Sequence, residues 1–357
     1  MPTQSSKSPS VPARLPTAEE QLRGKLNSEV SRWVGLRKRP TLIFRTPFIS
    51  PRTALLVHDA LEGLSFSEMD VLIESPGGMP DPAFQIANLI RGHAKQVTVV
   101  VPRWSKSAAT LIAVSMDEII LSRLGEMGPL DTHVPVKSDR DKPKRQSALE
   151  VVRAMTETQR SALQLWQLAA SLLLDNEGLT VHGAYELASS FVGNVAGTHF
   201  SPIQLDRYGE SVRHLEITKN YAASLLKRRG VHPNMALEIA ERLVENYASH
   251  QCIIDVPELV DMGLKARLAG EPDEAEILNK VRPLVGELTR FDNPRNPQQG
   301  CEVIEVLQCA PKPTTLPAVS PPPSSGTGPS VQQQSPDRRS PTASSKNGAV
   351  AAPASKD

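Results

Sequence analysis

The composition of this sequence lacks cysteine pairs, an excess of charge of one sign and long apolar runs. Its 357 residues include three cysteines, which are widely spaced and form no CxxC pair, so neither a disulfide framework nor a zinc site is indicated. Basic and acidic side chains nearly cancel, 40 against 39, for a formal charge of +1. This balance argues against nucleic acid as a partner. No stretch approaches the roughly 18 uninterrupted apolar residues of a membrane span.

The two ends of the chain are poor in large apolar side chains. The N-terminal stretch MPTQSSKSPSVPARLPTAEE lacks the apolar core of a secretory signal, and with the absences above this predicts a soluble, cytoplasmic protein. From Pro311 onward the chain is rich in Pro, Ser, Gln and Ala and cannot offset the entropy of ordering by burial. We predict a folded domain at residues 21–285, between a disordered N-terminus (1–20) and a disordered Pro/Ser-rich tail (286–357).

Residues 41–130 alternate between two kinds of pattern. Short β-rich runs occur there, TLIFR, DVLIES, QVTVVVP and DEIILSR, and helical patterns such as DPAFQIANLIRGH separate them. Strands that alternate with helices of this length predict right-handed crossover units and a mainly parallel sheet. From about Ser147 the apolar residues instead recur at spacings of three and four, which is typical of helices. The prediction is an α/β fold with a helical C-terminal portion.

The first turn of interest is Ser75-Pro76-Gly77-Gly78, at the end of the run DVLIES. Two adjacent glycines let the backbone adopt conformations closed to other residues and approach a bound group with its N–H groups pointing outward. Such a turn can form an oxyanion hole, although a strand-to-helix turn without any chemistry has the same composition. It lacks the spacing of dinucleotide and phosphate loops, so no nucleotide site is predicted.

The second turn follows the next strand, where KSAATLIAV opens an apolar helix with small residues. A serine at a helix start is usually an N-cap. Here, however, residues just past the carboxyl ends of neighbouring parallel strands converge, so the glycine turn and Ser107 are expected to face each other across a crevice. A serine whose following N–H shares that space with the Gly78 amide has the parts to attack a carbonyl and stabilise the oxyanion.

Three motifs together resemble a known superfold. SPGG after one strand, KSAATLIAVSMDEII after the next and then EMGPLD are similar to the Clp protease/crotonase-like superfold, a spiral of ββα units. They most resemble its bacterial branch, the serine dehydrogenase proteinase family, which is related to signal-peptide peptidase. The resemblance covers roughly residues 40–135, and a weaker similarity continues to about residue 268. It implies Ser107 as nucleophile and the amides of Gly78 and Ala108 as the oxyanion hole.

The sequence leaves the general base open. A serine needs a partner such as histidine or a desolvated lysine to act as a nucleophile, but Asp131 stands near where classical Clp proteases carry their histidine. His250, in YASHQCIIDVPELVDMGL, lies in a segment that resembles the closing element of the superfold, and we rank it first. His199, in GTHFSPI, resembles a segment of the serine dehydrogenase proteinases and ranks second. Asp131 is a candidate orienting acid.

Other residues are weaker candidates for the base. His133 lies two residues past Asp131 and can enter the crevice if the loop is shifted. A serine–lysine dyad of the signal-peptide-peptidase kind requires Lys106 or Lys137. Lys137 belongs to a charged run that is typical of a solvated loop. Lys106 adjoins Ser107, and adjacent residues at a helix start diverge by about 100°, which argues against direct contact.

The leading hypothesis is a serine hydrolase, a peptidase that forms an acyl-enzyme at Ser107. A peptide or protein substrate would lie extended beside the glycine turn, held by backbone hydrogen bonds as an added strand. Members of the superfold generally close into rings, so a homo-oligomer is implied by analogy. No cofactor or metal is required. Two alternatives stay open: a non-catalytic binding or scaffold protein on the same fold, and a crotonase-like acyl-CoA enzyme, which has no need of Ser107.

Overall fold

A six-stranded sheet forms the centre of the fold in the computed structural model, which describes residues 15–136, 144–175, 178–200, 205–249, 251–270, 272–293, 296 and 300–308. The strand order is β10-β1-β2-β3-β5-β9. The strands are β1 (Thr41–Arg45), β2 (Phe66–Glu74), β3 (Ala94–Val101), β5 (Glu118–Leu121), β9 (Ala266–Leu268) and β10 (Val303–Leu307). Every neighbouring pair is parallel except β10 with β1. The predicted mainly parallel sheet is therefore confirmed.

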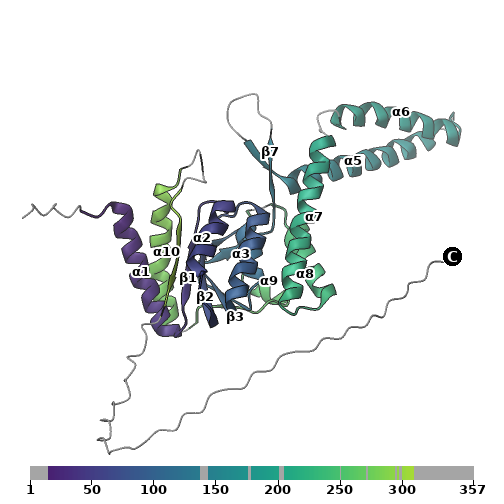
Figure 1. Cartoon of the computed structure of the whole chain (residues 1–357). Coiled ribbons are helices and arrows are strands. Elements are labelled where there is room, and N and C mark those ends of the chain that lie inside the picture. The colour runs from purple at the N-terminus through teal and green to yellow at the C-terminus, as the bar shows by residue number, and fades with distance from the viewer. Residues whose placement is uncertain are drawn as a thin grey trace, which may run out of the picture. The chain divides into compact units, whose positions relative to one another are not determined.

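Helices cover both faces of this sheet (Figure 1). On one face α1 (Ala18–Arg37) and α10 (Pro272–Leu288) pack side by side. The other face carries α2 (Pro51–Leu61), α3 (Pro80–His93), α4 (Ala108–Val114), α7 (Leu205–Arg228), α8 (Pro233–Glu245) and α9 (Val256–Asp261). Within β2, Val71 and Ile73 belong to the core under these helices, whereas Leu72 belongs to the core under α1 and α10. Because both faces are buried, the strands are continuous apolar runs rather than alternating ones.

The helices predicted after Ser147 are present. α5 (Ala148–Leu174) and α6 (Val181–Phe200) form a helical hairpin that projects from the region of the sheet (Figure 1). α7 packs against α5, and α8 packs against α7. Leu225 and Leu226 of α7 lie fully buried in the main core. The helical portion therefore completes the core as well as carrying the hairpin.

Two pairs of short strands lie outside the main sheet. β4 (Trp104–Ser105) pairs in parallel with β6 (Glu126–Met127), and β7 (His133–Val136) pairs antiparallel with β8 (Lys144–Ser147). The chain enters β4 directly from β3, and an isolated bridge joins Ser105 to Ser75 at the end of β2. This bridge brings the two turns that were singled out in the sequence together.

The described fold extends beyond both predicted boundaries. α1 begins at Ala18, where Thr17 and Glu20 form a capping box, inside the segment that we expected to be disordered. Regular structure continues past the boundary predicted at residue 285, because α10 ends at Leu288 and β10 pairs with the edge strand β1. β10 is short and follows a polar, proline-containing stretch, so composition alone gave no sign of it. The predicted disorder of residues 1–14 and 309–357 lies outside the described residues.

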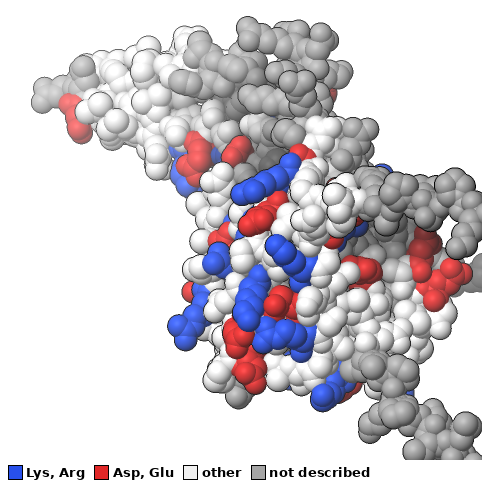
Figure 2. Space-filling view, turned by 90° about the vertical axis from the view of Figure 1, so that its left-hand side faces the viewer, with Lys and Arg blue, Asp and Glu red and all other residues white. Residues whose placement is uncertain are grey.

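Charges of both signs are interspersed on the face that α1 and α10 form (Figure 2). Arg32 lies 2.6 Å from Glu29 and 3.0 Å from Glu276, and Lys280 lies 2.8 Å from the same Glu276. Exposed pairs of this kind are screened by solvent and contribute little to stability. The described part of this face therefore carries several separate ion pairs rather than a patch of charge of one sign.

Candidate active site

Gly77 makes the closest contact between the two turns. Its φ is 111°, and a Cβ built on it would lie 2.7 Å from the carbonyl oxygen of Lys106 and 2.8 Å from Cβ of Ser107. Such distances are too short for any side chain, and positive φ also disfavours one. Glycine at this position therefore lets the strand-end turn after β2 lie directly against the start of α4. The predicted approach of the two turns is confirmed.

Gly78 is fixed by the segment that precedes α2. Ile49 donates from its N–H to the carbonyl of Gly77 at 2.9 Å and accepts from the N–H of Met79 at 2.9 Å. In this parallel bridge Gly78 lies between the two bonded residues, so its own N–H points away from Ile49. A Cβ on Gly78 would collide with the backbone of Ile49. Within the described ranges the Gly78 amide has no hydrogen-bond acceptor.

Ser107 begins α4 in a strained conformation. Its φ is 51° and its ψ is −121°, and its side chain does not cap the helix. Together with Lys38 it has a positive φ, which is uncommon outside glycine. The hydroxyl instead donates to the backbone carbonyl of Asp131 at 2.7 Å. The usual role of a serine at a helix start, that of an N-cap, is therefore not the one Ser107 has.

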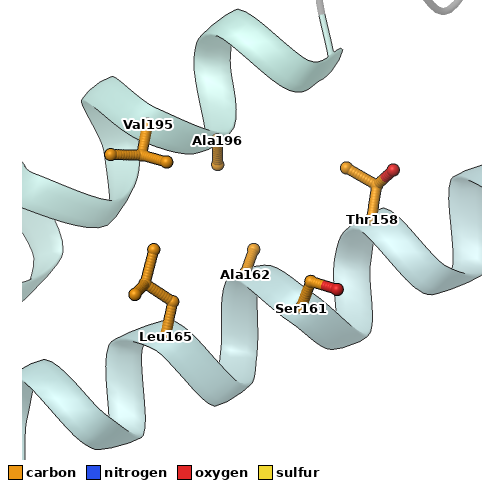
Figure 3. A pocket seen from close by; sticks show the side chains of 6 residues that line it. All are labelled: Thr158, Ser161, Ala162, Leu165, Val195 and Ala196. Atoms are coloured by element: carbon orange, nitrogen blue, oxygen red, sulfur yellow. The ribbon is translucent and has the colours of Figure 1, made fainter.

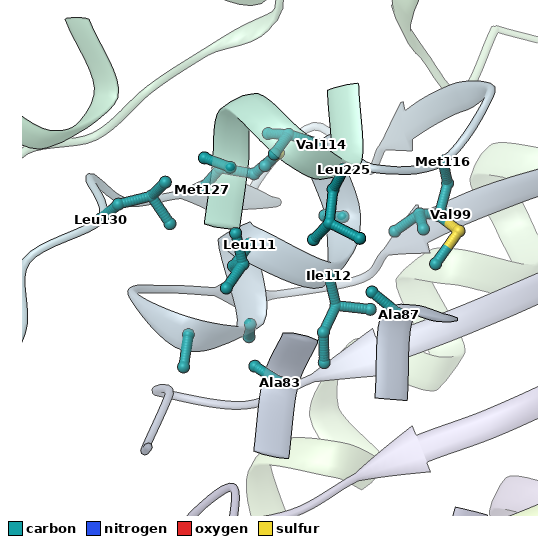
Figure 4. Packing of buried hydrophobic residues seen from close by; sticks show 14 of the residues in the cluster. Ala83, Ala87, Val99, Leu111, Ile112, Val114, Met116, Met127, Leu130 and Leu225 are labelled. Atoms are coloured by element: carbon teal, nitrogen blue, oxygen red, sulfur yellow. The ribbon is translucent and has the colours of Figure 1, made fainter. Parts of the chain in front are cut away.

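The position of Ser107 is set by a fully buried helix. All residues of α4 are buried, and Figure 4 shows Leu111, Ile112 and Val114 packed among side chains from α3, β3 and α7. Thr110 adds a polar anchor, since its hydroxyl lies 2.7 Å from the carbonyls of both Ser105 and Gly128. Close packing of this kind resists small displacements, so Ser107 is held in a fixed place.

The first amide of α4 lies beside the glycine turn. Ala108 is the first helical residue, where an N–H has no partner within the helix. Its nitrogen would be 3.2 Å from a Cβ on Gly77, which places it at the contact between the two turns. Among the described residues it has no hydrogen-bond acceptor. The amides of Gly78 and Ala108 are thus two unpaired donors on either side of this contact.

Asp131 connects the serine to the start of α5. It is fully buried, and its Oδ1 accepts from the N–H of Leu149 at 3.4 Å. Its Oδ2 is buried too and has no hydrogen-bond partner in the described part of the chain. A buried carboxylate oxygen without a donor is costly, so Oδ2 is an acceptor that its described surroundings leave unsatisfied. Asp131 itself presents only its backbone carbonyl to Ser107.

The candidate bases differ in where they fall. His250 and Lys137 lie outside the described residues. His133 is in β7 and His199 is in the last turn of α6, but their side chains are outside the described part. Lys106 points elsewhere, since its Nζ lies 3.1 Å from Oε1 of Glu126. Among the described residues, the hydroxyl of Ser107 has the Asp131 carbonyl as its hydrogen-bond partner and no base.

A cavity of about 220 Å³ in the α5–α6 hairpin lacks catalytic chemistry. Figure 3 shows its lining of small and apolar side chains from the two helices: Thr158, Ser161, Ala162, Leu165, Val195 and Ala196. None of these lining side chains ionises near neutral pH. The cavity is a packing gap within the hairpin rather than a reaction site.

The described residues show neither a metal site nor a membrane helix. No group of three or more His, Cys, Asp or Glu side chains gathers there as metal ligands would. No helix in the described ranges combines the length and the apolar character that crossing a membrane requires.

Sequence reasoning missed the residues that support the two turns. Ile49 holds Gly77 and Met79, and the hydroxyl of Ser75 accepts from the N–H of Gly77 at 3.1 Å. The strain at Ser107 was missed as well. Ser75 follows a buried strand directly, which is a visible signal, but nothing in the residues around Ile49 indicates a bridge to a turn that begins 26 positions later.

The comparisons with known proteins agree with the motifs. Residues 65–154 match the model of a family described as ClpP-like SDH-type serine proteinase, which confirms the resemblance and the fold class that it implies. Two uncharacterised proteins of Methanocaldococcus jannaschii are similar over shorter segments. One is 36% identical over 66 residues, 18% of this chain and 23% of the relative, and the other is 38% identical over 63 residues, 18% and 22%. The chain spans less than a quarter of the length of these curated relatives. No solved structure matches the chain.

Proposed function

Because residues 65–154 match the ClpP-like SDH-type serine proteinases, we propose that this chain is a serine peptidase whose nucleophile is Ser107. The observation that supports this most is the strained backbone of Ser107 together with a side chain that does not cap its helix. Strain of this kind costs about 1–3 kcal/mol and clusters at active sites. A sharp, strained turn before a helix is also how nucleophile elbows expose a serine.

In the proposed reaction, Ser107 Oγ attacks the carbonyl carbon of a peptide bond and gives its proton to a general base. The carbonyl oxygen becomes negatively charged and is held by the amides of Gly78 and Ala108, each unpaired in the described structure. One such preorganised donor contributes about 3–4 kcal/mol to catalysis. The base then protonates the leaving amine, and a water molecule hydrolyses the acyl-enzyme and restores Ser107. The reaction needs no cofactor.

For the base we propose His250 first and His199 second, as the sequence ranks them. Asp131 has the properties of an orienting acid, because its buried Oδ2 is free to accept an imidazole N–H. The start of α5 supports the negative charge, since Leu149 donates its N–H to the other carboxylate oxygen. The histidine would thus be turned towards Ser107, whose hydroxyl already lies at the Asp131 carbonyl.

The proposed substrate is a peptide or protein that binds in extended form beside Gly78. We also propose a homo-oligomer in the cytoplasm, by analogy with the superfold. A folded domain that covers residues 18–307, rather than 21–285, is the corresponding proposal for domain organisation.

The test of the nucleophile is covalent labelling. Purified full-length protein is treated with a fluorophosphonate and the modified residue is located by peptide mass mapping. An adduct on Ser107 that disappears in Ser107→Ala supports the peptidase. Failure of the folded protein to react overturns an activated Ser107.

A second function has one observation in its favour. In the described structure the hydroxyl of Ser107 donates to a backbone carbonyl rather than to a base, as it would in a binding or scaffold protein that keeps the crevice without catalysis. The same labelling experiment separates the two functions. A crotonase-like acyl-CoA enzyme also uses paired amides but has no use for a strained serine, so the strain at Ser107 counts against it.

A further inference from the structure

A charged pocket lies next to the glycine turn, at the carboxyl ends of β1 and β2. Its volume is about 250 Å³. This is below the range of about 300–1,000 Å³ usual for pockets that hold drug-sized ligands, so it fits one side chain. Its lining includes Arg45, Glu74, Pro76, Arg103, Trp104 and Asp292. The sheet-face residues Arg45 and Glu74 are almost fully buried, whereas Trp104 at the rim is 36% exposed.

The carboxylates in this pocket are already occupied by partners within the chain. Oε1 of Glu74 lies 2.9 Å from Nε of Arg103, and Oε2 accepts from the N–H of Trp104 at 3.0 Å. Both oxygens of Asp292 accept from the guanidinium of Arg45, and Oδ1 also accepts from the N–H of Cys301 at 3.1 Å. Each of these carboxylate oxygens therefore already has at least one donor or cation from within the chain.

Arg103 brings hydrogen-bond donors to the pocket that the described residues leave unused. Arg103 stacks on the ring of its neighbour Trp104, with its guanidinium carbon 3.6 Å from the ring centroid. Arginine carries five N–H donors, and the Nη groups of Arg103 make no hydrogen bond to any described residue. Stacking fixes the plane of the guanidinium, which favours recognition of a planar anion such as a carboxylate. The pocket is therefore suited to an acceptor that carries a negative charge.

Burial of Glu74 strengthens this preference. Desolvation raises the pKa of its carboxyl to about 7, although Arg103, the Trp104 amide and Arg45 all oppose the shift. Near and below neutral pH a fraction of Glu74 is thus uncharged. The balance of the pocket then moves from two cations against two carboxylates towards a net positive charge.

The pocket lies within reach of the proposed reaction centre. Pro76 is part of its wall, and Gly78 follows two residues later, so the two residues lie at most about 7 Å apart along the chain. A peptide whose scissile carbonyl meets the Gly78 amide would therefore bring a side chain one to three residues away over the pocket. The bridge between Ser75 and Ser105 connects the segment that carries Pro76 and Gly78 to the segment that carries Arg103 and Ser107.

We propose that this pocket is a subsite that selects an acidic side chain of the substrate, glutamate or aspartate, with Arg103 as its anchor. This rests on the proposed peptidase function, and it specifies the substrate class of the same site.

The test measures binding, so that it does not depend on turnover. Full-length Ser107→Ala protein is titrated with fluorescein-labelled, amidated octapeptides of alanine and valine, in which a single Glu or Gln occupies each position in turn. Affinity is read from fluorescence anisotropy. At one position the Glu peptide should bind about tenfold more tightly than the Gln peptide, because a charge-assisted hydrogen bond replaces a neutral one.

Variants of Arg103 identify the anchor. Arg103→Gln should bring the Glu-to-Gln ratio to about one, and Arg103→Lys should retain part of it. Arg103→Gln leaves Glu74 buried without its ion-pair partner, so a Glu74→Gln/Arg103→Gln double variant provides a second protein without an unpaired charge. Arg91→Gln is the matched control, since Arg91 pairs with Asp117 at 3.3 Å outside the pocket and should leave the ratio unchanged.

Equal affinity for Glu and Gln peptides at every position, or a preference that persists in both Arg103→Gln proteins, would overturn the subsite. Absence of binding by every peptide would overturn it as well. Failure of fluorophosphonate labelling in the wild-type protein bears instead on the nucleophile, so a Glu preference without labelling leaves the pocket standing as a binding site alone.

Discussion

Two serines that begin helices after strands, Ser107 and Ser147, show how differently the same sequence feature is used. Ser147 adopts an ordinary conformation, and its side chain accepts from the N–H of Glu150 at 3.0 Å. Ser107 has a positive φ, and its hydroxyl leaves its own helix to meet the carbonyl of Asp131. Ser147 therefore stabilises a helix end, while Ser107 leaves one uncapped and carries strain.

The surroundings of the two serines explain the difference. Gly77 and Gly78 press against the start of α4 and leave amides there without partners, whereas the start of α5 is satisfied by Ser147 and by Oδ1 of Asp131. One helix start is arranged for stability and the other retains unused donors. Unused donors beside a strained serine are what an oxyanion hole requires.

The largest difference is expected between the variants that remove the hydroxyl of Ser107 and the hydroxyl of Ser147. Ser107→Ala is expected to abolish fluorophosphonate labelling and to lower peptide hydrolysis by about 1,000-fold or more, because it removes the proposed nucleophile. Ser147→Ala should label at the wild-type rate. Labelling is followed by in-gel fluorescence, with circular dichroism to verify folding. Loss of labelling in both variants, or in neither, would contradict the distinction.

Adding a methyl group to Gly77 should damage the contact that distinguishes the two helix starts. In Gly77→Ala the new carbon meets the Lys106 carbonyl and Ser107 Cβ at a φ of 111°. Strain and overpacking together should cost about 3 kcal/mol of unfolding free energy, and labelling should fall with it. Gly24→Ala is the control, because Gly24 lies within α1 with nothing near its Cβ position and alanine there favours the helix. Denaturant titration measures both.

The sequence predicted the parts of this site that depend on local signals. The Gly77-Gly78 turn and Ser107 each follow a strand directly, so parallel topology was enough to bring them together. The support from Ile49 could not be predicted, because it depends on how the segment before α2 packs. The role of Asp131 was predicted only as an orienting acid, although its backbone carbonyl is what contacts Ser107. A carbonyl is present at every residue and leaves no trace in a sequence.

The sequence analysis did not predict the strand β10, for a related reason. VIEVL pairs with the edge strand β1, and only that pairing gives its side chains a core to enter. Arg45 of β1 also holds the segment before β10, because its guanidinium donates to the carbonyl of Cys301 and to Oδ2 of Asp292. Arg45 ends the run TLIFR and is almost fully buried, but its burial cannot be read from the sequence, so its pairing with Asp292 could not be predicted.

Asp131 contacts both helix starts, so a substitution there sharpens the comparison. Asp131→Asn keeps an oxygen that can accept from Leu149, so the unfolding free energy should change by less than about 1 kcal/mol. The charge that would orient a histidine through Oδ2 is lost, and the labelling rate should fall about tenfold or more. The two rates are compared across pH 6–9. An unchanged labelling rate would restrict Asp131 to capping α5.

The smallest effects are expected when each serine is changed for its backbone or its cap. Ser107→Gly should raise the unfolding free energy by about 1 kcal/mol over Ser107→Ala, because glycine adopts a φ of 51° without strain. Ser147→Ala should lower it by about 1 kcal/mol relative to wild type, because the N–H of Glu150 loses its acceptor. Urea titration of the wild type and the three variants measures both differences in unfolding free energy. If Ser107→Gly were no more stable than Ser107→Ala, the strain would not be stored at that residue. The assignment of Ser107 as an activated nucleophile would then rest on labelling alone.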